Sequence, residues 1–521
     1  MLKMSGMKSN LLANVAGKAW SLVAIVLFTP LYLKFLGIEA FAIIGLYNSF
    51  CMLLIIVDPG LSSTLARELA WLSPLPGRRS EMATLVRTLE TSFFLITILV
   101  TLPFLFLSDV VARHWINLRN LSVESAVTAL RLLAGAACLQ FVAGFYTGGL
   151  RGLQRHVHLN GLLICTGLLR SAGSVAVLWL VSPTIEAFMA WQVLVNAAQL
   201  IAIRHLVWRL LRDGAGEAQF QFGVLKSVWR YAGGMTVIGA TGALFLQLDK
   251  IILSKLLTLD ALGAYTVGGI VGSIPLAAAA PIGVTVLPRL TELVSLNDAA
   301  RAHRVYHGAS QLVSIVVFPL VIVVGLYARE ILAIWTRDPA SAEQAYRIAS
   351  LLILSSGVVA CMFMPYSLQM AYGWTGLSIS LNIFGIAALT PLMLWLVPRW
   401  GGAGAALAFL LVTVAQFVAG VQIMHKRFLV DQKWSYWGRD IGAPLAAALV
   451  LAGIGWFVIP VPHGQWTLVA YLLATWMLAS FAALLCADEL RPLALAWLRS
   501  RAGRSWAVPN AFGAKSGRGA R

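Results

Sequence analysis

The stretch that decides the fold runs from Phe245 to Leu293 and reads FLQLDKIILSKLLTLDALGAYTVGGIVGSIPLAAAAPIGVTVLPRLTEL. Two apolar segments are joined by a short turn at Leu257 to Ala261, and the second segment carries no charge from Ala261 to Leu287. About twenty apolar residues are enough for a helix to cross a bilayer. Pro288 and Arg289 then supply a helix breaker and a cation, which is typical of a helix that leaves the membrane on its cytoplasmic side. The stretch therefore predicts a hairpin of two transmembrane helices.

The composition of the whole chain is that of a polytopic membrane protein. Of 521 residues, 59% are hydrophobic and 12% are charged, and the mean hydropathy is +0.82. An ordinary soluble domain has about 25% charged residues. The net charge of +18 would suggest nucleic-acid binding if the basic residues shared one soluble face. They lie instead in short loops between apolar segments, so we expect no nucleic-acid partner.

Apolar segments recur along the chain and predict about fourteen transmembrane helices in all. Besides the central hairpin, they lie at 11–36, 40–65, 91–108, 125–150, 159–181, 187–208, 309–328, 348–371, 377–397, 404–424, 441–461 and 466–486. Along this path about 28 of the 39 Lys and Arg residues fall on one side, which is normally the cytoplasm. Both termini and the basic connector from Arg209 to Arg230 are therefore predicted to be cytoplasmic.

An internal repeat indicates how these helices are grouped. Many transporters contain internal repeats. When the two halves of this sequence are aligned with an offset of about 220 residues, Leu178–Pro183 aligns with Leu394–Pro398 and Gln199 aligns with Gln416. Both copies begin with a helix that enters from the cytoplasm, so the repeat is parallel, with its axis along the membrane normal. The alternative is chance similarity between apolar segments, which share a small set of residue types.

Several short motifs, in their order along the chain, resemble those of the polysaccharide and oligosaccharide exporters. These are Wzx-type flippases for lipid-linked oligosaccharides, within the multidrug/oligosaccharidyl-lipid/polysaccharide superfamily. The motifs are Leu36–Phe41, Asp58–Ser63, Ala66–Ala70, Gly152–Arg155, Leu259–Tyr265 and Pro398–Ala406. Each motif is weak alone, and their common order makes the resemblance strong. Ala42 and Pro59 depart from the family pattern, and neither departure concerns the substrate.

The resemblance implies an all-α membrane protein with two six-helix lobes around a central cavity. The N-terminal lobe would be residues 1–215 and the C-terminal lobe 216–430, followed by two additional transmembrane helices (431–487) and a basic cytoplasmic tail (488–521). The cargo would be an undecaprenyl-pyrophosphate-linked oligosaccharide, such as a repeat unit of O-antigen, capsule or exopolysaccharide. It would move from the cytoplasmic to the outer leaflet of the bacterial inner membrane by alternating access. A polysaccharide polymerase and chain-length machinery are candidate partners.

Other classes of function are considered beside this one. A drug or cation antiporter of the same superfamily would need acids in its cavity, whereas the deepest charge here is an arginine. A lipid II-type flippase is a close alternative that the sequence separates poorly. A membrane glycosyltransferase, polymerase or ligase would need catalytic groups on a sizeable outer loop, and none is predicted. We therefore expect no enzyme. The five cysteines form no CxxC pair, so we expect neither a metal site nor a disulfide, and no cofactor is expected.

Arg170 is the main candidate for binding the substrate. It lies about eleven residues from either end of its predicted helix, too deep to reach the membrane surface cheaply. Its planar guanidinium suits phosphate oxygens, and no acid is predicted at its depth, so we expect it to bind the pyrophosphate of the cargo. The alternative is that Arg170 bonds to backbone carbonyls or to amide side chains such as Gln140 or Asn196.

Three other intramembrane charges, Lys18, Asp58 and Asp249, are candidates because charge at membrane depth is rare and usually functional. Lys18 and Asp58 are predicted at similar depth on adjacent helices, where they form a structural ion pair or take part in ion coupling or cargo contact. Asp249 lies near the outer end of its helix beside Lys250, whose long side chain can extend to the interface. For Asp249 a structural role and ion coupling both stay open.

Overall fold

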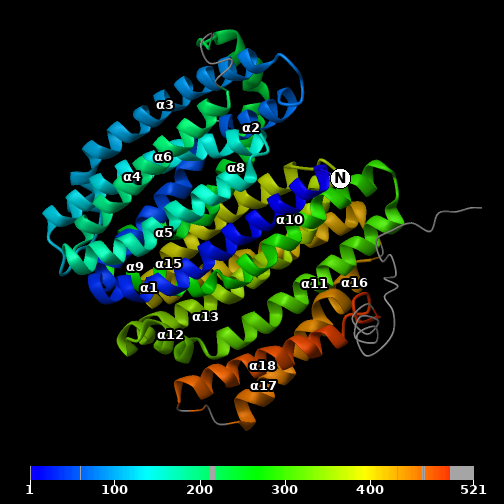
Figure 1. Ribbon diagram of the computed structural model, residues 1–521. Helices are drawn as coiled ribbons and strands as arrows, with labels where there is room; N and C mark the ends of the chain where they lie inside the picture. Colours follow the sequence, from blue (N-terminus) through cyan, green and yellow to red (C-terminus); the bar gives the residue numbers. More distant parts are fainter. Residues whose placement is uncertain are drawn as a thin grey trace, which may run out of the picture. The chain divides into compact units, whose positions relative to one another are not determined.

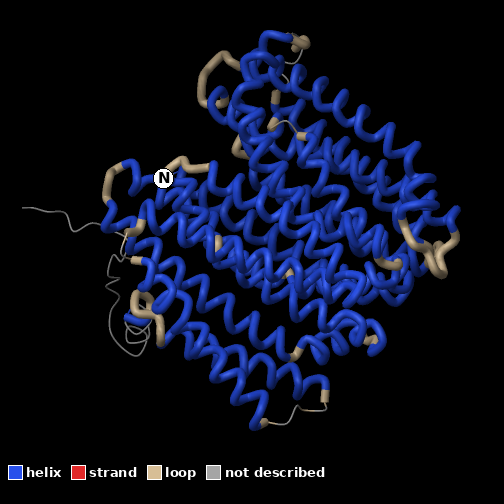
Figure 2. Tube along the Cα trace, turned by 180° about the vertical axis from the view of Figure 1, so that it is seen from behind, coloured by secondary structure: helices blue, strands red, loops and turns tan. Residues whose placement is uncertain are grey.

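The computed structural model describes residues 2–492 except 59, 212–217, 431, 460, 461 and 463. Within helices, the side chains of residues 2–19, 21, 22, 55, 227–236 and 238 are also outside this description. All regular elements of the described part are helices (Figure 1), and Figure 2 shows the loops between them from behind. The single β-bridge in this part joins Asn117 and Thr258. The predicted all-α class is confirmed.

The first part of the chain contains seven helical elements before the connector. They are α1 (Leu2–Val57), α2 (Leu61–Leu72), α3 (Arg79–Val110), the π-helical η1 (Val111–Trp115), α4 (Val123–Gly152), α5 (His156–Leu180) and α6 (Ile185–Leu210). The central stretch then forms α8 (Phe222–Leu256), α9 (Leu259–Gly272) and α10 (Ile274–Ser295). The predicted turn at Leu257 to Ala261 thus begins directly after the end of α8.

The rest of the described chain is also a succession of helices. They are α11 (Ala299–Leu326), α12 (Ala328–Thr336), α13 (Pro339–Cys361), α14 (Phe363–Ala371), α15 (Gly376–Phe428), α16 (Lys433–Ser435), the π-helical η2 (Tyr436–Gly442), α17 (Ala443–Val458) and α18 (Gln465–Leu485).

Eleven helical segments in the described part are long and apolar enough to cross a membrane. Two of them, in α1 and α15, contain glycines with non-helical backbone angles, Gly37 and Gly401. With 56 and 53 residues, each helix would be about 80 Å long if straight, well over twice the hydrocarbon thickness. If α1 and α15 each cross the membrane twice and the 35-residue α8 crosses it once, the number of crossings is fourteen, as predicted. The chain is a multi-pass membrane protein, and the number fourteen stays a prediction.

The chain reverses at Gly37 inside α1. Its φ of 74° and ψ of 169° form a conformation that glycine adopts easily and other residues avoid. The arm before Gly37 lies along α5, because the Tyr32 hydroxyl donates to the Ser171 carbonyl at 3.1 Å. The arm after it lies along α4, because the Tyr47 hydroxyl donates to Gln140 Oε1 at 2.5 Å. One glycine therefore places α1 against two consecutive helices.

The predicted span 40–65 is wrong in its second part. α1 ends at Val57 and α2 begins at Leu61, so Asp58 lies in the break between two helices and not inside one. Gly60 has a left-handed conformation there, with φ 73°. The apolar composition continues across the break, which is why hydropathy did not reveal it.

The predicted second helix of the central hairpin is divided as well. α9 ends at Gly272 and α10 begins at Ile274. Pro275 occupies the first turn of α10, where its missing N–H costs no helical hydrogen bond. Pro288 does not end this helix, because α10 continues through it to Ser295. The predicted end at Pro288 and Arg289 is therefore wrong by about two turns.

The chain divides into two compact units. The first comprises Met1–Gly269, Arg329–Ile348 and Gly376–Val412, and the second Ile270–Ala328, Ala349–Thr375 and Thr413–Arg521. Both units are thus built from segments that lie far apart in the sequence. The lobe boundaries implied by the resemblance stay predictions.

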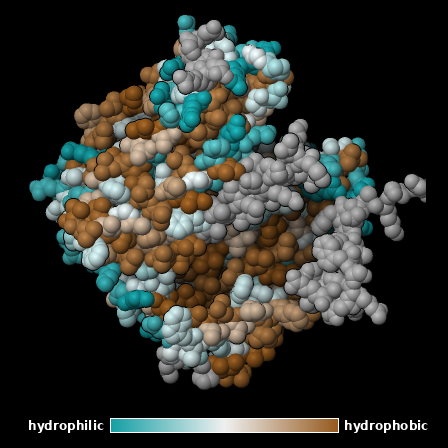
Figure 3. Space-filling model, in the orientation of Figure 1, coloured by the Kyte–Doolittle hydropathy of each residue, from teal (hydrophilic) through white to brown (hydrophobic). Residues whose placement is uncertain are grey.

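Large apolar side chains cover much of the surface, as Figure 3 shows for one face. On α3, Leu99 is 74% exposed and Phe106 is 79% exposed. Soluble proteins rarely expose extended apolar surfaces, whereas a bilayer favours them. The exposed apolar side chains agree with the membrane assignment made from composition.

Candidate functional site

Arg170 lies near the middle of α5, in the first unit. It is fourteen positions after His156 and ten before Leu180, the two ends of the helix. At 1.5 Å per residue these separations are about 21 Å and 15 Å. The helix contains no other Lys, Arg, Asp or Glu. Arg170 therefore lies near the middle of its helix, as the sequence predicted, and its depth in the membrane stays a prediction.

Two amide side chains of α6 hold the guanidinium. Nη2 of Arg170 donates to Asn196 Oδ1 and to Gln199 Oε1, both at 2.7 Å. A separation of three residues places Asn196 and Gln199 on the same face of α6. Nε of Arg170 is buried and has no hydrogen-bond partner. No ion pair with a carboxylate involves Arg170 in the described part of the chain. The cation is thus positioned without being neutralised.

A directed chain of hydrogen bonds extends from Arg170 to α4. Nδ2 of Asn196 donates to the Tyr47 hydroxyl at 2.9 Å and to the Ala136 carbonyl at 2.8 Å, and the Tyr47 hydroxyl donates to Gln140 Oε1. Arginine can only donate and a carbonyl can only accept, so the orientation of the Asn196 amide follows. Three helical segments, in α6, α1 and α4, therefore hold Arg170 of α5 in one position, as a preorganised binding group requires.

A second group of polar atoms lies one turn away. The Ser174 hydroxyl donates to the Arg170 carbonyl at 2.7 Å and accepts from Gln192 Nε2 at 2.9 Å. Oε1 of Gln192 is buried without a partner. Buried polar atoms normally have partners, so the unpaired donor Nε of Arg170 and the unpaired acceptor Oε1 of Gln192 each favour a polar ligand or water. The site can offer hydrogen bonds of both kinds beside a positive charge.

The sequence predicted part of this arrangement. Asn196 was one of the amides expected if Arg170 bonded to neighbouring side chains, and that contact is confirmed. Gln140 is reached only through Tyr47. Neither Tyr47 nor Gln199 was predicted as a member of the site. The signal that could have revealed it is the spacing of Gln192, Asn196 and Gln199, which lie on one face of the apolar middle part of α6.

The predicted pair of Lys18 and Asp58 is not tested, because the Lys18 side chain lies outside the described residues. Oδ1 of Asp58 accepts a hydrogen bond from the backbone N–H of Leu61 at 2.8 Å. The first N–H groups of a helix have no partner within it, and an acidic side chain that accepts from one stabilises the helix start. Asp58 therefore has a structural contact at the start of α2, whatever else it does.

Substitutions at Asp58 should separate this structural contact from a role in transport. We expect Asp58→Ala to lower the free energy of unfolding by about 1 kcal/mol, because the acceptor at the helix start is lost. Asp58→Asn keeps an acceptor oxygen and should unfold close to the wild-type temperature. Thermal unfolding of the two purified variants measures this difference. An Asp58→Asn protein that folds normally but transports nothing would assign ion coupling instead.

Asp249 joins the two arms of the central hairpin. The Tyr265 hydroxyl of α9 donates to its Oδ2 at 2.7 Å. Lys250 Nζ lies 4.0 Å from Oδ1 and donates to Gln247 Oε1 at 3.2 Å. Oδ1 of Asp249 is buried without a hydrogen bond. The side chain thus anchors Tyr265, and its place in ion coupling stays a prediction.

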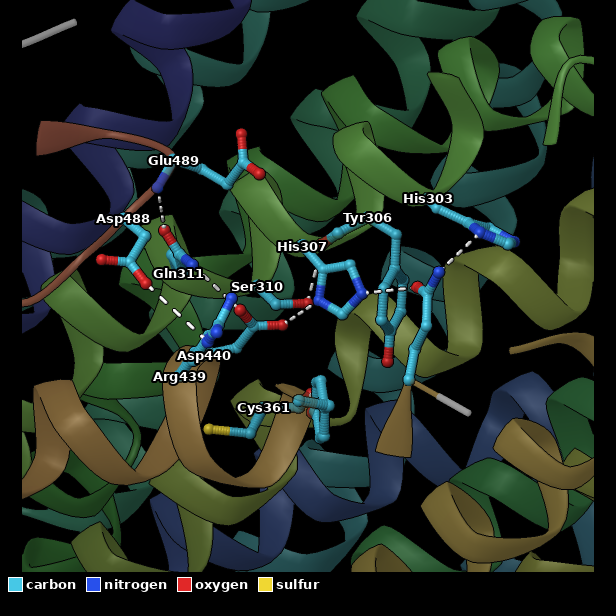
Figure 4. Close-up of polar contacts among 12 residues, drawn as sticks. His303, Tyr306, His307, Ser310, Gln311, Cys361, Arg439, Asp440, Asp488 and Glu489 are labelled. Carbon is cyan, nitrogen blue, oxygen red and sulfur yellow. Dashed lines mark hydrogen bonds and ion pairs between the residues drawn. The ribbon is translucent and has the colours of Figure 1, made fainter. Parts of the chain in front are cut away.

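The second unit contains a polar cluster that the sequence did not reveal (Figure 4). Nδ1 of His307, on α11, hydrogen bonds to Oδ2 of Asp440, on η2. Gln311, one turn after His307, donates to Oδ1 of the same carboxylate at 3.0 Å. His307 and Asp440 are 133 positions apart in the sequence, and each lies at the end of an apolar segment. Neither position looked unusual in the sequence.

Comparison with known proteins adds independent findings. A family model described as "Polysaccharide biosynthesis protein" matches residues 6–294. A candidate O-antigen transporter of Shigella flexneri is 22% identical over 381 residues, which are 72% of this chain and 87% of that protein.

Solved structures show the same fold. The lipid II flippase MurJ, in an inward closed conformation, has a TM-score of 0.67 at 10% identity, over 96% of this chain and 99% of that one. An inward-facing multidrug resistance transporter of the MATE family, in the MOP superfamily, has a TM-score of 0.64 at 14% identity. The match covers 80% of this chain and 96% of the MATE transporter. At these identities the likeness concerns the fold alone.

Proposed function

Because the chain belongs to the polysaccharide biosynthesis protein family, we propose that it is a flippase for undecaprenyl-pyrophosphate-linked oligosaccharides. It moves them from the cytoplasmic to the outer leaflet of the bacterial inner membrane by alternating access. The family and the structural relatives are transporters and not enzymes. The relative from Shigella flexneri, described as an O-antigen transporter, supports a repeat unit of a surface polysaccharide as cargo.

The physical problem that such a protein solves is the transfer of polar groups through hydrocarbon. An unpaired polar group costs several kcal/mol in an apolar medium, and an ionised phosphate costs more. A prenyl chain has no such cost and can stay in the bilayer throughout. The protein therefore has to supply hydrogen bonds and positive charge only for the pyrophosphate and the sugars.

The observation that carries the proposal is the state of Arg170. Its guanidinium lies near mid-span in α5, is held by two neutral amides, and keeps an unpartnered Nε–H. Arginine with a carboxylate partner would be neutralised, whereas arginine with amide partners retains its full attraction for an anion. A phosphate oxygen that accepts from Nε–H would complete the hydrogen bonding of the side chain. We assign Arg170 to the pyrophosphate on this basis.

The same proposal gives the orientation of the chain. Both termini and the connector from Arg209 to Arg230 lie in the cytoplasm, where loops rich in Lys and Arg are retained. Lys18 is a further candidate for contact with the cargo near the cytoplasmic side. A polymerase and chain-length machinery would take up the cargo at the outer leaflet.

A deletion strain provides the direct test. We expect lipid-linked oligosaccharide to accumulate and surface polysaccharide to disappear, because polymerisation needs the repeat unit on the outer side. Mass spectrometry of the extracted lipids identifies the accumulated species, and restoring the gene should reverse both effects. Accumulation of lipid II instead would indicate a lipid II-type flippase. Unchanged polysaccharide together with impaired drug efflux would indicate an antiporter, and either result would contradict the proposal.

A further inference from the structure

A chain of polar side chains joins α11 to the C-terminal helices within the second unit (Figure 4). α11 contributes His303, His307 and Gln311, while Asp440 comes from η2. The chain also includes Gln432, just before α16, and the backbone of Glu489, just after α18. It therefore connects α11 with both the beginning and the end of the C-terminal helix pair, α17 and α18.

The hydrogen bonds of Asp440 have a defined direction. The backbone N–H of Glu489 donates to Gln311 Oε1 at 3.0 Å, and a backbone N–H can only donate. Nε2 of Gln311 is therefore the atom that faces Asp440, and it donates to Oδ1 at 3.0 Å. Asp440 is 1% exposed. The carboxylate is thus buried, and one of its oxygens accepts from a neutral amide.

His307 uses both ring nitrogens. Nδ1 hydrogen bonds to Oδ2 of Asp440, and Nε2 lies 2.8 Å from Gln432 Oε1. Nε2 of Gln432 lies 3.0 Å from Nδ1 of His303. A carboxylate and an amide oxygen are both acceptors, so both ring nitrogens of His307 donate in this arrangement. With the Gln432 amide in this orientation, His307 is an imidazolium that pairs with the Asp440 carboxylate.

A neutral His307 requires a different arrangement. With one proton, on Nδ1, its Nε2 becomes an acceptor, and the amide of Gln432 must turn to donate to it. Oε1 of Gln432 then faces His303, which must donate from Nδ1. The orientation of Gln432 and the tautomer of His303 thus follow the charge of His307.

Loss of the proton also leaves Asp440 as a buried anion without a cation in contact. Arg439 cannot replace His307, since its side chain is 71% exposed and faces Asp488 at 3.9 Å. A buried carboxylate that loses its cationic partner is strongly destabilised. The other titratable or charged groups around the pair are His303, Tyr306, Cys361, His425, Lys433, Tyr436, Arg439, Asp488 and Glu489.

We propose that His307 and Asp440 form a proton-binding site that controls how firmly the C-terminal helices are held against α11. When His307 carries its proton, the ion pair and its hydrogen bonds close this contact. When the proton leaves, the contact loosens where η2 and the segment after α18 meet α11. The closed contact binds the proton more tightly than the open one, so acid favours the closed contact and rising pH favours the open one.

The other end of α11 has a contact of a different kind. The hydroxyls of Tyr327 and Tyr471 lie 2.6 Å apart, and the rings of Tyr327 and Trp456 pack edge to face with centroids at 4.9 Å. An unperturbed tyrosine stays neutral up to about pH 10. This contact should not respond to pH in the range in which histidine titrates. It serves as an internal reference for the contact at His307.

Hydrogen exchange of the full-length protein in lipid nanodiscs tests the proposal without any transport assay. After correction for intrinsic rates, peptides from 433–442 and 486–492 should exchange roughly tenfold faster at about pH 8.5 than at about pH 6. This is the change expected if the closed contact binds the proton about ten times more tightly than the open one. Peptides around Tyr471 should exchange at the same corrected rate at both pH values.

Variants on α11 and η2 provide the matched controls. His307→Gln should exchange fast in both segments at both pH values, because the cation is lost. Adding Asp440→Asn should restore part of the protection, since no buried charge is left without a partner. His303→Gln lies one turn away and should keep the pH dependence. A wild-type protein whose protection in the two segments does not change with pH overturns the proposal. If His303→Gln and His307→Gln lose the pH dependence of hydrogen exchange to the same extent, the proposal is also overturned.

Discussion

Replacing Arg170 by alanine should leave the protein in the membrane at a normal level and abolish surface polysaccharide. Arg170 is the only Lys or Arg of α5, two neutral amides hold it without neutralising it, and under the proposed function it binds the pyrophosphate of the cargo. Arg170→Lys should keep partial activity, because the charge remains while the planar fork is lost. Quantification of surface polysaccharide, normalised to the amount of protein in the membrane, measures these effects.

Gln199, which accepts a hydrogen bond from Arg170, allows a more specific test of the role of Arg170. Gln199→Glu changes the size of the side chain little and places a carboxylate where Oε1 of Gln199 now lies, 2.7 Å from Arg170 Nη2. If Arg170 serves only packing, the new ion pair should leave transport intact. If Arg170 binds an anionic cargo, the carboxylate competes with the cargo, and transport should fall about as far as in Arg170→Ala.

Arg131 provides the control for charge removal. It lies on α4 in the same unit and is exposed, so Arg131→Ala should transport normally. Wild-type polysaccharide output from Arg170→Ala at a normal protein level would contradict the assignment of Arg170 to the cargo. A loss of folded protein in Arg170→Ala, together with normal transport by Gln199→Glu, would assign a packing role instead.

Replacing Gly148 by alanine should sharply reduce the amount of folded protein. α4 approaches α2 so closely that a Cβ at Gly148 would lie 2.5 Å from the Ser62 carbonyl oxygen, and one at Gly152 would lie 2.5 Å from that of Ala66. Both obstacles are backbone atoms, which cannot rotate away. Overpacking of this kind typically costs 1–3 kcal/mol, and we expect about 3 kcal/mol here because a helix must move.

Gly144 is a matched control on the same helix, one turn before Gly148. A Cβ there would meet nothing within 4 Å, so Gly144→Ala should be neutral or slightly stabilising, given the better helix propensity of alanine. Thermal unfolding and the fraction of monodisperse protein after solubilisation compare the two variants. Equal stability of Gly144→Ala and Gly148→Ala would mean that the close approach of α2 and α4 does not contribute to folding.

This contact also explains motifs that carried the resemblance. Ser62 belongs to the stretch Asp58–Ser63, Ala66 begins the stretch Ala66–Ala70, and Gly152 begins Gly152–Arg155. The three stretches meet where α2 packs on α4. Small residues that allow two backbones to approach are the usual basis of helix packing in membranes. These motifs therefore indicate the fold and not the cargo.

Local properties were enough to predict the membrane class, the all-α fold and most of the helices. Hydropathy and the distribution of Lys and Arg are read from a window of about twenty residues, which matches one transmembrane helix. The depth of Arg170 follows from the same window. The breaks at Asp58 and Ser273 were missed because apolar composition continues across them, and the breaks depend on single glycines and prolines.

The partners of the charged groups were decided by the tertiary structure. Arg170 is separated from Asn196 by 26 positions, and Asn196 from Tyr47 by 149. His307 and Asp440 are separated by 133 positions. Arg170 stood out in the sequence, but its partners did not, and only the packing of helices in three dimensions brings the members of each group together. In a low-dielectric interior that packing determines whether a charge meets an opposite charge, as at Asp440, or only neutral amides, as at Arg170.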